Sequence, residues 1–354
     1  MKRFYPFARI DNSWYTVGLL ALLLGLAAPG RAQVFYLTAG SGGSNPDGTI
    51  TSDDALTRIN YDGNNPVVIA SAITGSPFLL ALDGDATRAF IYESVPANRA
   101  IKVLDMSTGV LIRSFAVNGA VTAMRYDAAA DYLYYLTAGP DDAVVEAADA
   151  LSRVHADGTG TQVLKPSLAA APQLLVLNVG GGELYFYDDA PGARVINALS
   201  FASYTSTRTT AVTERVTGLE YDQGSNFIYY LTSGTANAQN AADALRRFRP
   251  DGSDAALVAS SVTNSPRHLG LDAGNNRAFI YEGQTVSRGI RVISLTTGAQ
   301  IGNYPVGSDI TALATPTVAT VVTGAASALT STSATLGGTV TQTGGAGVTE
   351  RGVV

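Results

Sequence analysis

Few residues in this sequence are suited to acid, base or nucleophilic catalysis. The 354 residues include two His and no Cys, which excludes disulfides, thiolate zinc sites, cysteine nucleophiles and His-rich metal centres. His268 has the chemistry of a general base, but the sequence assigns it no Ser or Asp partner. No phosphate-binding loop, dinucleotide fingerprint or zinc motif is present. The residue inventory therefore favours binding over catalysis.

Variable positions within a repeated segment are the first candidates for a binding site. Residues 77–83, 172–178 and 266–272 are similar heptapeptides that end in Asp or Asn. Their second and third positions differ: Phe78, Gln173 and Arg267 are followed by Leu79, Leu174 and His268. Such divergence marks a ligand site or reflects drift, and both interpretations stay open. The first predicts a ligand-binding role for Phe78, Gln173, Arg267 and His268.

Three insertions, each of which follows a Tyr-Leu-Thr motif, are further candidates for binding, and two of them contain acidic residues. The insertions span residues 41–53, 140–148 and 235–242. Their acidic candidates for ligand binding are Asp47, Asp53, Asp141, Asp142 and Glu146. Carboxylates bind Ca²⁺, but residues 45–53 lack the spacing of a calcium-binding loop. We therefore predict no cofactor, with calcium as the alternative.

Short β-strands must position these candidates, because the chain is a repeat of strand-like segments. Tyr36-Leu-Thr-Ala-Gly40 recurs at residues 135–139 and, with Ser for Ala, at residues 230–234, a period of roughly 95 residues. Each period holds two versions of a pattern of four short strands. Four strands in about 47 residues is typical of a propeller blade. We predict an all-β fold, a six-bladed β-propeller of three double-blade repeats over residues 33–316.

The two ends of the repeated region predict that the ring is closed. Residues 34–38 resemble the second strand of a blade, and no first strand precedes them. A segment that resembles the missing first strand occurs at residues 310–314. The last blade is therefore expected to combine both ends of the domain, which removes two open sheet edges.

Most of the repeated Asp residues are expected to be structural. One set, which ends the innermost strands, is expected to cap turns rather than to bind metal, and comprises Asp83, Asp127, Asp222, Asp272 and Asn178. A second set, in hairpin turns, comprises Asp62, Asp157 and Asp251. A third set is expected to form hydrogen bonds between blades and pairs Asp54, Asp149 and Asp243 with Arg58, Arg153 and Arg247.

Two charges fall inside innermost strands, where the other residues are mostly apolar. These are Arg125 and Glu220. An ion pair or a solvated central tunnel explains their position. His155, two residues before a turn, is expected to be exposed.

Residues 34–315 resemble the YWTD six-bladed propellers, the class B repeats of the low-density-lipoprotein receptor. The resemblance is carried by Leu133-Tyr-Tyr-Leu-Thr137, by Ala150-Leu-Ser-Arg153 and by Asp157-Gly-Thr-Gly160. It is partial, since Leu136 and Ala138 stand where the family has Trp and Asp. Bacterial propellers related to the NHL and lactonase groups share much of the pattern. The resemblance implies the fold and, since YWTD propellers are mostly ligand-binding modules, a binding role.

Residues 1–32 are predicted to be an export signal. Lys2, Arg3 and Arg9 precede an apolar run at residues 17–28, and Gly30 and Ala32 suit cleavage before Gln33. A membrane anchor is the alternative, but spanning requires about 20 apolar residues. No later run suits a membrane span, so we predict no transmembrane segment after signal removal. Export without Cys is typical of a bacterial secreted or cell-surface protein.

Residues 317–354 differ in composition from the repeats, being rich in Thr, Ser, Gly, Ala and Val. Residues 330–340 and 344–354 resemble the opening strands of a bacterial fibronectin type III-like domain. Such sandwiches have about 7 strands, so we expect a truncated, partial β-sandwich segment with further modules downstream. The alternative is a natural tail that pairs with the propeller or stays loose.

Together these features predict an exported, non-enzymatic binding or adhesion module with a protein or glycan ligand at the face that carries the three insertions. A metal-dependent hydrolase or lactonase with a divalent ion in the tunnel is the first alternative, and a purely structural spacer is the second. Nucleic acid is not an expected partner, because the formal net charge is −6.

Overall fold

The computed structural model describes residues 33–39, 52–73, 76–84, 86–190, 192–234, 239–284 and 287–316, and the backbone of strands at residues 319–323 and 338–343. The chain separates into two compact units, residues 1–32 and residues 33–354. The predicted export signal and Asp47 lie outside the described residues. Within the described residues, no helix is long and apolar enough to span a membrane.

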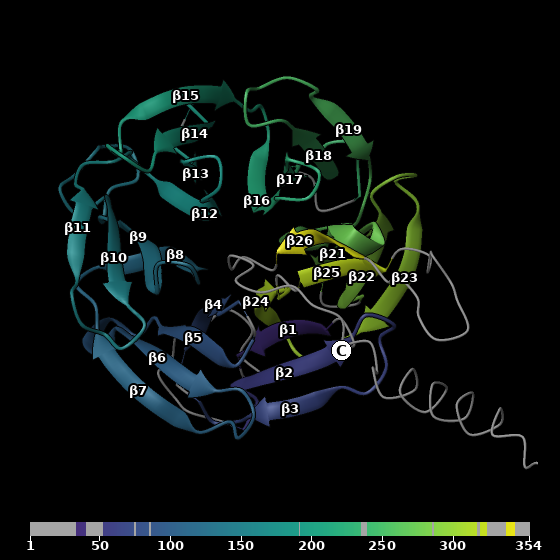
Figure 1. Ribbon diagram of the computed structural model, residues 1–354, viewed down its shortest axis with the longest axis horizontal. Helices are drawn as coiled ribbons and strands as arrows, with labels where there is room; N and C mark the ends of the chain where they lie inside the picture. Colours follow the sequence, from purple (N-terminus) through teal and green to yellow (C-terminus); the bar gives the residue numbers. More distant parts are fainter. Residues whose placement is uncertain are drawn as a thin grey trace, which may run out of the picture. The chain divides into compact units, whose positions relative to one another are not determined.

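Six four-stranded antiparallel sheets surround a central axis (Figure 1). We number these blades in chain order. Blade 1 comprises β4 (Pro77–Leu82), β5 (Arg88–Glu93), β6 (Ala100–Asp105) and β7 (Leu111–Ala116). Blade 2 comprises β8 (Ala120–Asp127), β9 (Tyr132–Ala138), β10 (Ala150–His155) and β11 (Gln162–Lys165). Blade 3 comprises β12 (Pro172–Asn178), β13 (Glu183–Asp188), β14 (Val195–Ser200) and β15 (Ser206–Ala211).

Blade 4 comprises β16 (Arg215–Asp222), β17 (Phe227–Ser233), β18 (Ala244–Phe248) and β19 (Ala256–Ala259). Blade 5 comprises β20 (Pro266–Asp272), β21 (Arg277–Glu282), β22 (Gly289–Ser294) and β23 (Gln300–Pro305). Blade 6 comprises β24 (Ile310–Ala314), β1 (Gln33–Thr38), β2 (Ala55–Asn60) and β3 (Val67–Ala70). The described helices are the short 3-10 turns η1 (Pro96–Asn98) and η2 (Ala273–Asn275). The prediction of an all-β six-bladed propeller is confirmed.

The burial of a strand depends on its place within the blade. The second strands, such as β5, are buried along almost their whole length because each is covered by a neighbouring blade on both faces. Between blades 1 and 2, for example, Phe90, Tyr92, Met124, Leu133 and Tyr135 form one buried cluster. The outermost strands are polar or exposed, as in Ser206–Ala211. The core is therefore a set of layers between blades.

Ring closure occurs through the strands that the sequence predicts. In blade 6, β24 pairs with β1, placing Ala314 opposite Phe35, Leu313 opposite Tyr36 and Ala312 opposite Leu37. This contact joins residues from the two ends of the repeated region in one sheet. Beyond it, β25 (Ala319–Thr323) and β26 (Gly338–Thr343) form a two-stranded antiparallel sheet. The fibronectin-like assignment of residues 317–354 stays a prediction.

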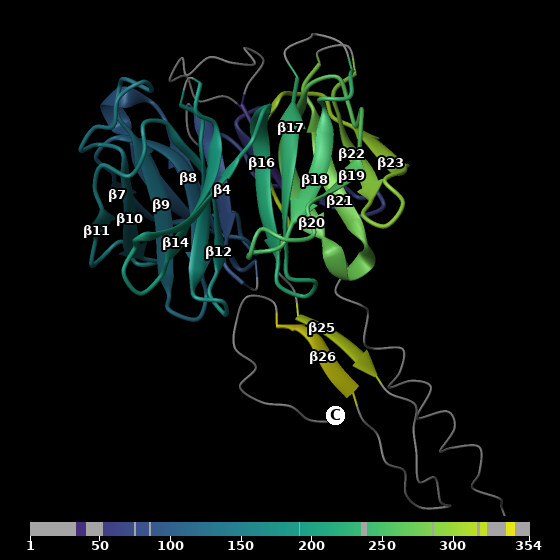
Figure 2. The same ribbon diagram turned by 90° about the horizontal axis from the view of Figure 1, so that it is seen from above.

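The register defines the two faces of the propeller. Pro77 at the start of β4 lies opposite Glu93 at the end of β5, so the connections from second to third strands emerge where the innermost strands begin. We call this end the loop face; the strands run from it to the opposite face (Figure 2). The described ends of the three insertions lie on the loop face, as the sequence analysis expects.

The Asp residues at the opposite face cap turns, as predicted. Oδ1 of Asp83 accepts hydrogen bonds from the backbone N–H groups of Thr87 and Arg88, at 2.7 and 2.9 Å. Oδ1 of Asp157 accepts from the N–H of Thr159 at 2.8 Å. The same pattern recurs, with a side-chain or backbone donor from the following turn, at Asp62, Asp127, Asn178, Asp222, Asp251 and Asp272.

Candidate functional site

The three insertions of the loop face follow the second strand in alternate blades. The base of each insertion is held by an equivalent hydrogen bond from a threonine hydroxyl. The hydroxyl of Thr38 donates to the carbonyl of Asp53 at 2.6 Å. Thr137 donates in the same way to Ala148 at 2.6 Å, and Thr232 to Ala242 at 2.7 Å. Each bond ties the end of a second strand to the last residues of its insertion. The base of each loop is therefore fixed to a rigid blade.

Fully buried carboxylates fix two of these loops further. Asp149 accepts hydrogen bonds from the N–H groups of Gly139 and Glu146, at 2.6 and 2.5 Å. Asp243 accepts from the N–H groups of Gly234 and Asn240, both at 2.9 Å. The prediction that these carboxylates form hydrogen bonds between blades is wrong for both residues, because backbone donors of their own loops occupy them.

The arginines expected to pair with these carboxylates lie over aromatic rings instead. The guanidinium carbon of Arg153 is 4.2 Å from the ring centroid of Tyr132, and that of Arg247 is 4.3 Å from that of Phe227. His155 also stacks on Tyr132, at 4.0 Å between ring centroids, and is half-buried rather than exposed as expected. The cation–π contacts keep these side chains within their own blades.

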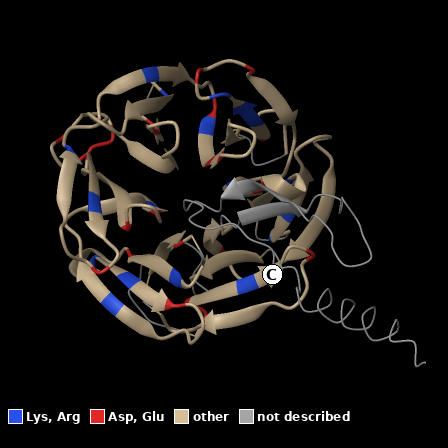
Figure 3. Ribbon diagram, in the orientation of Figure 1, with Lys and Arg blue, Asp and Glu red and all other residues tan. Residues whose placement is uncertain are grey.

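Two of the insertions carry acidic residues on their described parts, and their role in ligand binding stays a prediction. Asp53, Asp141 and Asp142 are exposed, and Glu146 is half-buried with one oxygen that has no hydrogen bond. Between the acids, Val144 and Val145 are 54% and 50% exposed. The tip of the blade 2 loop therefore presents two adjacent apolar side chains beside carboxylates. Elsewhere on the ring, acidic and basic residues are interspersed (Figure 3).

Blades 1, 3 and 5 carry an acid where the other blades carry the loop-fixing Thr. These acids are Glu93, Asp188 and Glu282. Asp188 accepts a hydrogen bond from the N–H of Ala171, in the connection from the preceding blade, at 3.0 Å. Burial raises the pKa of the Asp188 carboxyl, and the hydrogen bond from the N–H of Ala171 opposes this rise. Glu282 likewise accepts from Thr263 and Asn264. Asp188 and Glu282 thus hold the connections that lead from the preceding blades.

A β-bulge at the start of the innermost strands shapes the mouth of the tunnel. In blade 5 the register shifts between Arg267 and Leu269, and His268 takes a left-handed φ of 47°. Leu174 in blade 3 has φ 48° at the equivalent bulge. Such conformations are strained for residues other than Gly and concentrate at functional sites. The variable positions of the repeat therefore coincide with a distortion of the strand.

The predicted mouth residues differ in their surroundings. Phe78 is 47% exposed at the start of β4. Arg267 is exposed and approaches Asp309, with 3.8 Å between Nη1 and Oδ2. Gln173 is half-buried. Of the four, His268 alone lines the cavity described next.

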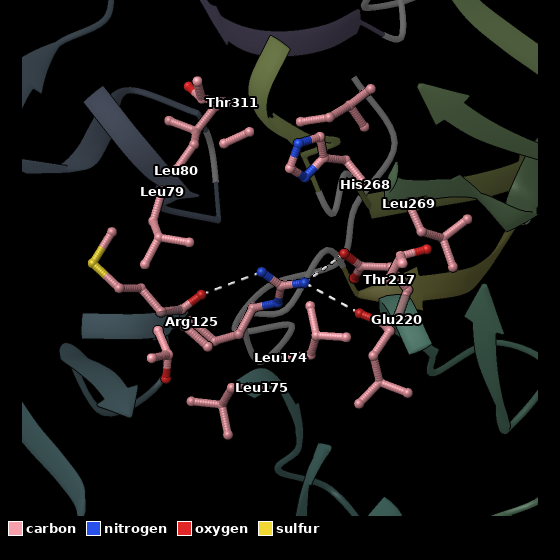
Figure 4. Close-up of a pocket in the computed structure, with 17 residues that line it drawn as sticks. Leu79, Leu80, Arg125, Leu174, Leu175, Thr217, Glu220, His268, Leu269 and Thr311 are labelled. Carbon is pink, nitrogen blue, oxygen red and sulfur yellow. Dashed lines mark hydrogen bonds and ion pairs between the residues drawn. The ribbon is translucent and has the colours of Figure 1, made fainter. Parts of the chain in front are cut away.

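The tunnel contains a cavity of about 70 Å³, lined by residues from the innermost strands of all six blades (Figure 4). Leucine is the most frequent residue of the lining. Arg125 and Glu220 form an ion pair across it, with Nη2 to Oε1 at 2.5 Å. Burial raises the pKa of the Glu220 carboxyl, and Arg125 opposes that shift. The ion-pair interpretation of these two charges is confirmed.

His268 is held neutral at the wall of this cavity. Its Nε2 lies 3.1 Å from the carbonyl oxygen of Ile310, which only accepts, so Nε2 carries the proton. Burial lowers the pKa of the imidazole to about 4, with a smaller contribution from the Arg267 cation. At neutral pH Nδ1 is therefore an acceptor.

A set of threonines also lines the cavity, and the sequence analysis did not single it out. Thr122 and Thr311 donate hydrogen bonds to the carbonyls of Pro172 and Pro77 in the next blade, at 2.5 and 2.7 Å. Thr217 occupies the equivalent place, but its buried hydroxyl has no hydrogen-bond partner. A Val-Thr or Ile-Thr pair recurs at residues 121, 216 and 310, and this repeat could have indicated the threonines from the sequence.

Among the described residues, no three His, Cys, Asp or Glu side chains gather as a metal site would require. The half-buried Glu146 and the buried Asp149 both lie beside Gly139. Calcium binding at the insertions stays a prediction.

No protein-family model matches the sequence, and comparison with curated proteins finds no match. Solved structures share its fold. A chain of a nidogen/laminin complex matches with a TM-score of 0.61 and 12% identity, over 80% of this chain and 97% of that one. TolB from Acinetobacter baumannii matches with a TM-score of 0.60 and 13% identity, over 88% and 74%. Hydrazine synthase of Kuenenia stuttgartiensis matches with 0.56 and 11%, over 74% and 84%. At these identities the similarities define the class, a β-propeller.

Proposed function

We propose that this chain is an exported, non-enzymatic binding module that takes a protein or glycan ligand on its loop face. The observation that carries the proposal is the contrast within that face. The bases of the insertions on alternate blades share one fixed geometry, whereas the tips and the tunnel mouth differ from repeat to repeat. Variable loops on a rigid frame are a common arrangement for recognition. A neighbouring fold from a nidogen/laminin complex is compatible with protein binding.

Exposed apolar side chains near carboxylates supply suitable contacts. Val144 and Val145 at the tip of the blade 2 loop and Phe78 at the tunnel mouth are each about half exposed. Such side chains gain free energy when a partner removes them from water. Asp141 and Asp142 beside the valines favour a partner with basic or hydroxyl groups. We extend the proposal to a secreted or cell-surface location in a bacterium and to an adhesive role.

Paired variants of the full chain test the proposal. Binding to glycan arrays and to purified extracellular proteins is compared for the wild type, for Val144→Ser with Val145→Ser, and for Val163→Ser with Leu257→Ser. The last pair is a matched control, because Val163 and Leu257 are equally exposed but lie on outermost strands. We expect only the loop variant to lose affinity, by about tenfold. Equal loss in both variants would contradict the assignment of the loop face.

Metal dependence separates this proposal from a propeller-type hydrolase. A ligand that binds only the folded state raises the unfolding temperature by mass action. We expect the unfolding temperature of the full chain to be the same with EDTA and with magnesium or zinc. A shift of several degrees with either metal would move the account to the hydrolase alternative. A shift with calcium that Glu146→Gln abolishes would assign calcium to the insertions.

A further inference from the structure

A buried tyrosine near the end of the second strand recurs in blades 1, 3 and 5, and in two of these blades its hydroxyl is bound to a carboxylate. Tyr187 donates to Oδ1 of Asp189 at 2.6 Å. Tyr281 donates in the same way to Asp309. The equivalent residue of blade 1 is Tyr92, because β5 and β21 both end in Ile-Tyr-Glu. Its hydroxyl is the exception.

An arginine completes the cluster in blade 3. Arg194, the residue before β14, donates from Nε to the same Oδ1 of Asp189 at 3.0 Å. The other oxygen, Oδ2, lies 3.0 Å from Nε of Arg215 at the start of β16. One carboxylate of the chain therefore accepts from a phenol and from the guanidinium before the third strand, and pairs with a second guanidinium.

Blade 1 keeps the first two donors of this cluster and has no acid at the position of the carboxylate. The strand registers align four pairs of residues, with blade 1 named first: Tyr92 and Tyr187, Arg99 and Arg194, Ser94 and Asp189, Ala120 and Arg215. The Tyr92 hydroxyl and Nε of Arg99 are both buried, and neither has a hydrogen-bond partner. The two atoms that meet on Oδ1 in blade 3 are thus both unpaired here.

The groups beside the Tyr92 hydroxyl are donors. Burial raises the pKa of Tyr92, and the N–H of Val121 and the cation of Arg99 oppose that rise, so both lie near the phenol oxygen. Neither group accepts the hydroxyl proton. Buried donors without an acceptor are costly, so an anionic oxygen that accepts from Tyr92 and Arg99 gains free energy.

The side-chain acceptors closest in sequence are bound to other groups. Oε1 of Glu93 accepts from the N–H of Val95 at 3.3 Å, and its Oε2 lies 3.8 Å from Nζ of Lys102. The hydroxyl of Ser94 is 2.6 Å from that of Ser76. These side chains therefore do not supply the acceptor that Asp189 supplies in blade 3.

The cluster borders solvent on the loop face. Ser94, Arg99 and Ala120 are half-buried. Ser94 and Ala120 are smaller than their blade 3 counterparts, so the atoms of one carboxylate and of one guanidinium are missing from this place. A ligand group of that size and charge would restore the blade 3 arrangement.

From this comparison we infer that the junction of blades 1 and 2 binds a carboxylate ligand, with the Tyr92 hydroxyl and Nε of Arg99 as donors to one of its oxygens. That oxygen takes the place of Oδ1 of Asp189 in blade 3. Two sources share this chemistry: a small free carboxylate, or an acidic side chain of a protein partner on the loop face. The second source rests on the proposed function, whereas the first does not.

Titration of the full chain with acetate tests the inference without any partner. We expect saturable binding in the roughly millimolar range, followed by the Nε–H resonance of Arg99, and no binding of the neutral acetamide. A blocked Gly-Asp-Gly peptide, with Gly-Asn-Gly as control, then distinguishes the sources. Binding of both acetate and the Asp peptide assigns an acidic side chain of a partner, whereas binding of acetate alone assigns a small free carboxylate.

Matched variants connect binding to the named donors. Tyr92→Phe should weaken acetate binding by roughly three- to tenfold, and it removes no hydrogen bond within the protein. Arg99→Gln should weaken binding by about tenfold or more. Tyr187→Phe is the control, because it removes the same group where Asp189 already fills the site, and it should bind acetate like the wild type.

Ser94→Asp supplies the missing carboxylate from the chain itself. By comparison with blade 3, the new side chain accepts from Tyr92 and Arg99. We expect this variant to lose acetate binding and to unfold at a higher temperature than the wild type. A raised unfolding temperature shows that the lost binding does not come from unfolding.

Two results overturn the inference. One is the absence of acetate binding in the wild type, which would leave the loop-face proposal intact. The other is acetate binding that is unchanged in Tyr92→Phe and Arg99→Gln, or in Ser94→Asp, which would place the anion elsewhere.

Discussion

His268 links the stability of the propeller to pH. The pKa of its imidazole is about 4 in the folded chain, against 6.5 for the free side chain, because burial disfavours the cation. Between these values the unfolded chain binds more protons than the folded one, so stability falls as the pH falls from about 6.5 to about 4. The full contribution is roughly 3 kcal/mol.

A variant that keeps the backbone isolates this contribution. His268→Asn is suitable because Asn tolerates the left-handed φ of 47°. We expect the difference in free energy of unfolding between wild type and variant, measured by urea denaturation, to change between pH 7 and pH 4. A difference that is constant over this range would show that His268 titrates normally in the folded state.

Thr122 and Thr217 provide a second comparison at the scale of single residues. Thr122 donates to the carbonyl of Pro172 in the next blade, whereas Thr217 has no partner. We expect Thr122→Val to lower the free energy of unfolding by about 1 kcal/mol and Thr217→Val to leave it nearly unchanged. Equal losses in urea denaturation would mean that Thr217 forms a bond that the structure does not contain.

For single residues, the sequence predicts hydrogen bonds to neighbours in the chain better than hydrogen bonds to distant segments. Turn capping by Asp83 or Asp157 follows from residues two to five positions away, so the pattern alone suffices. The Arg125–Glu220 pair was predictable because unpaired charges are costly in apolar strands. The acceptors of Thr122 and the donors to Asp149 depend on loop paths and blade spacing, which residue spacing does not fix.

At the scale of elements, Asp149 is the anchor of the blade 2 insertion. Its carboxylate accepts hydrogen bonds from two backbone N–H groups of the loop and is fully buried. Asp149→Ala should cost about 2 kcal/mol or more, because two donors lose a charged acceptor. Hydrogen exchange should quicken in residues 139–149 while β8 and β9 stay protected.

Asp141→Ala is the control for this prediction. Asp141 lies in the same loop but is exposed and accepts from Ala143. Its removal should change the unfolding temperature little. If both variants behaved alike, the insertion would be held by contacts other than the Asp149 carboxylate.

The strands themselves were largely predictable, because each element is short and repeated three times with small variations. The aromatic second strands match the expected segments at residues 36–40, 135–139 and 230–234 near their ends. The bulges at Leu174 and His268 were not predictable, since a bulge changes pairing without changing hydrophobic alternation in so short a segment.

At the scale of the whole molecule, closure of the ring should control cooperativity. In β24, Ala312 is buried opposite Leu37 of β1. Ala312→Pro disrupts this pairing and should lower the free energy of unfolding by about 3 kcal/mol or more. Ile112→Pro, at an exposed bulge of the outermost β7, should cost much less. Circular dichroism melts test both, and equal loss would contradict a structural role for closure.

Ring architecture followed from the sequence because the missing first strand could be located at residues 310–314. Binding at the loop face follows less directly from the sequence. The propellers that share the fold are only 11–13% identical. Fold similarity at this level does not transfer a ligand. The differences among the three insertions and the tunnel mouth carry the functional proposal instead.

The most direct test of binding at the loop face is a hydrogen-exchange footprint of the full chain with a ligand selected from the glycan and protein screens. We expect protection in residues 139–149 and 239–243 and at the tunnel mouth around Phe78 and His268, with no change in the opposite-face turns around Asp83 and Asp157. Protection confined to those turns or to the outermost strands would contradict the account.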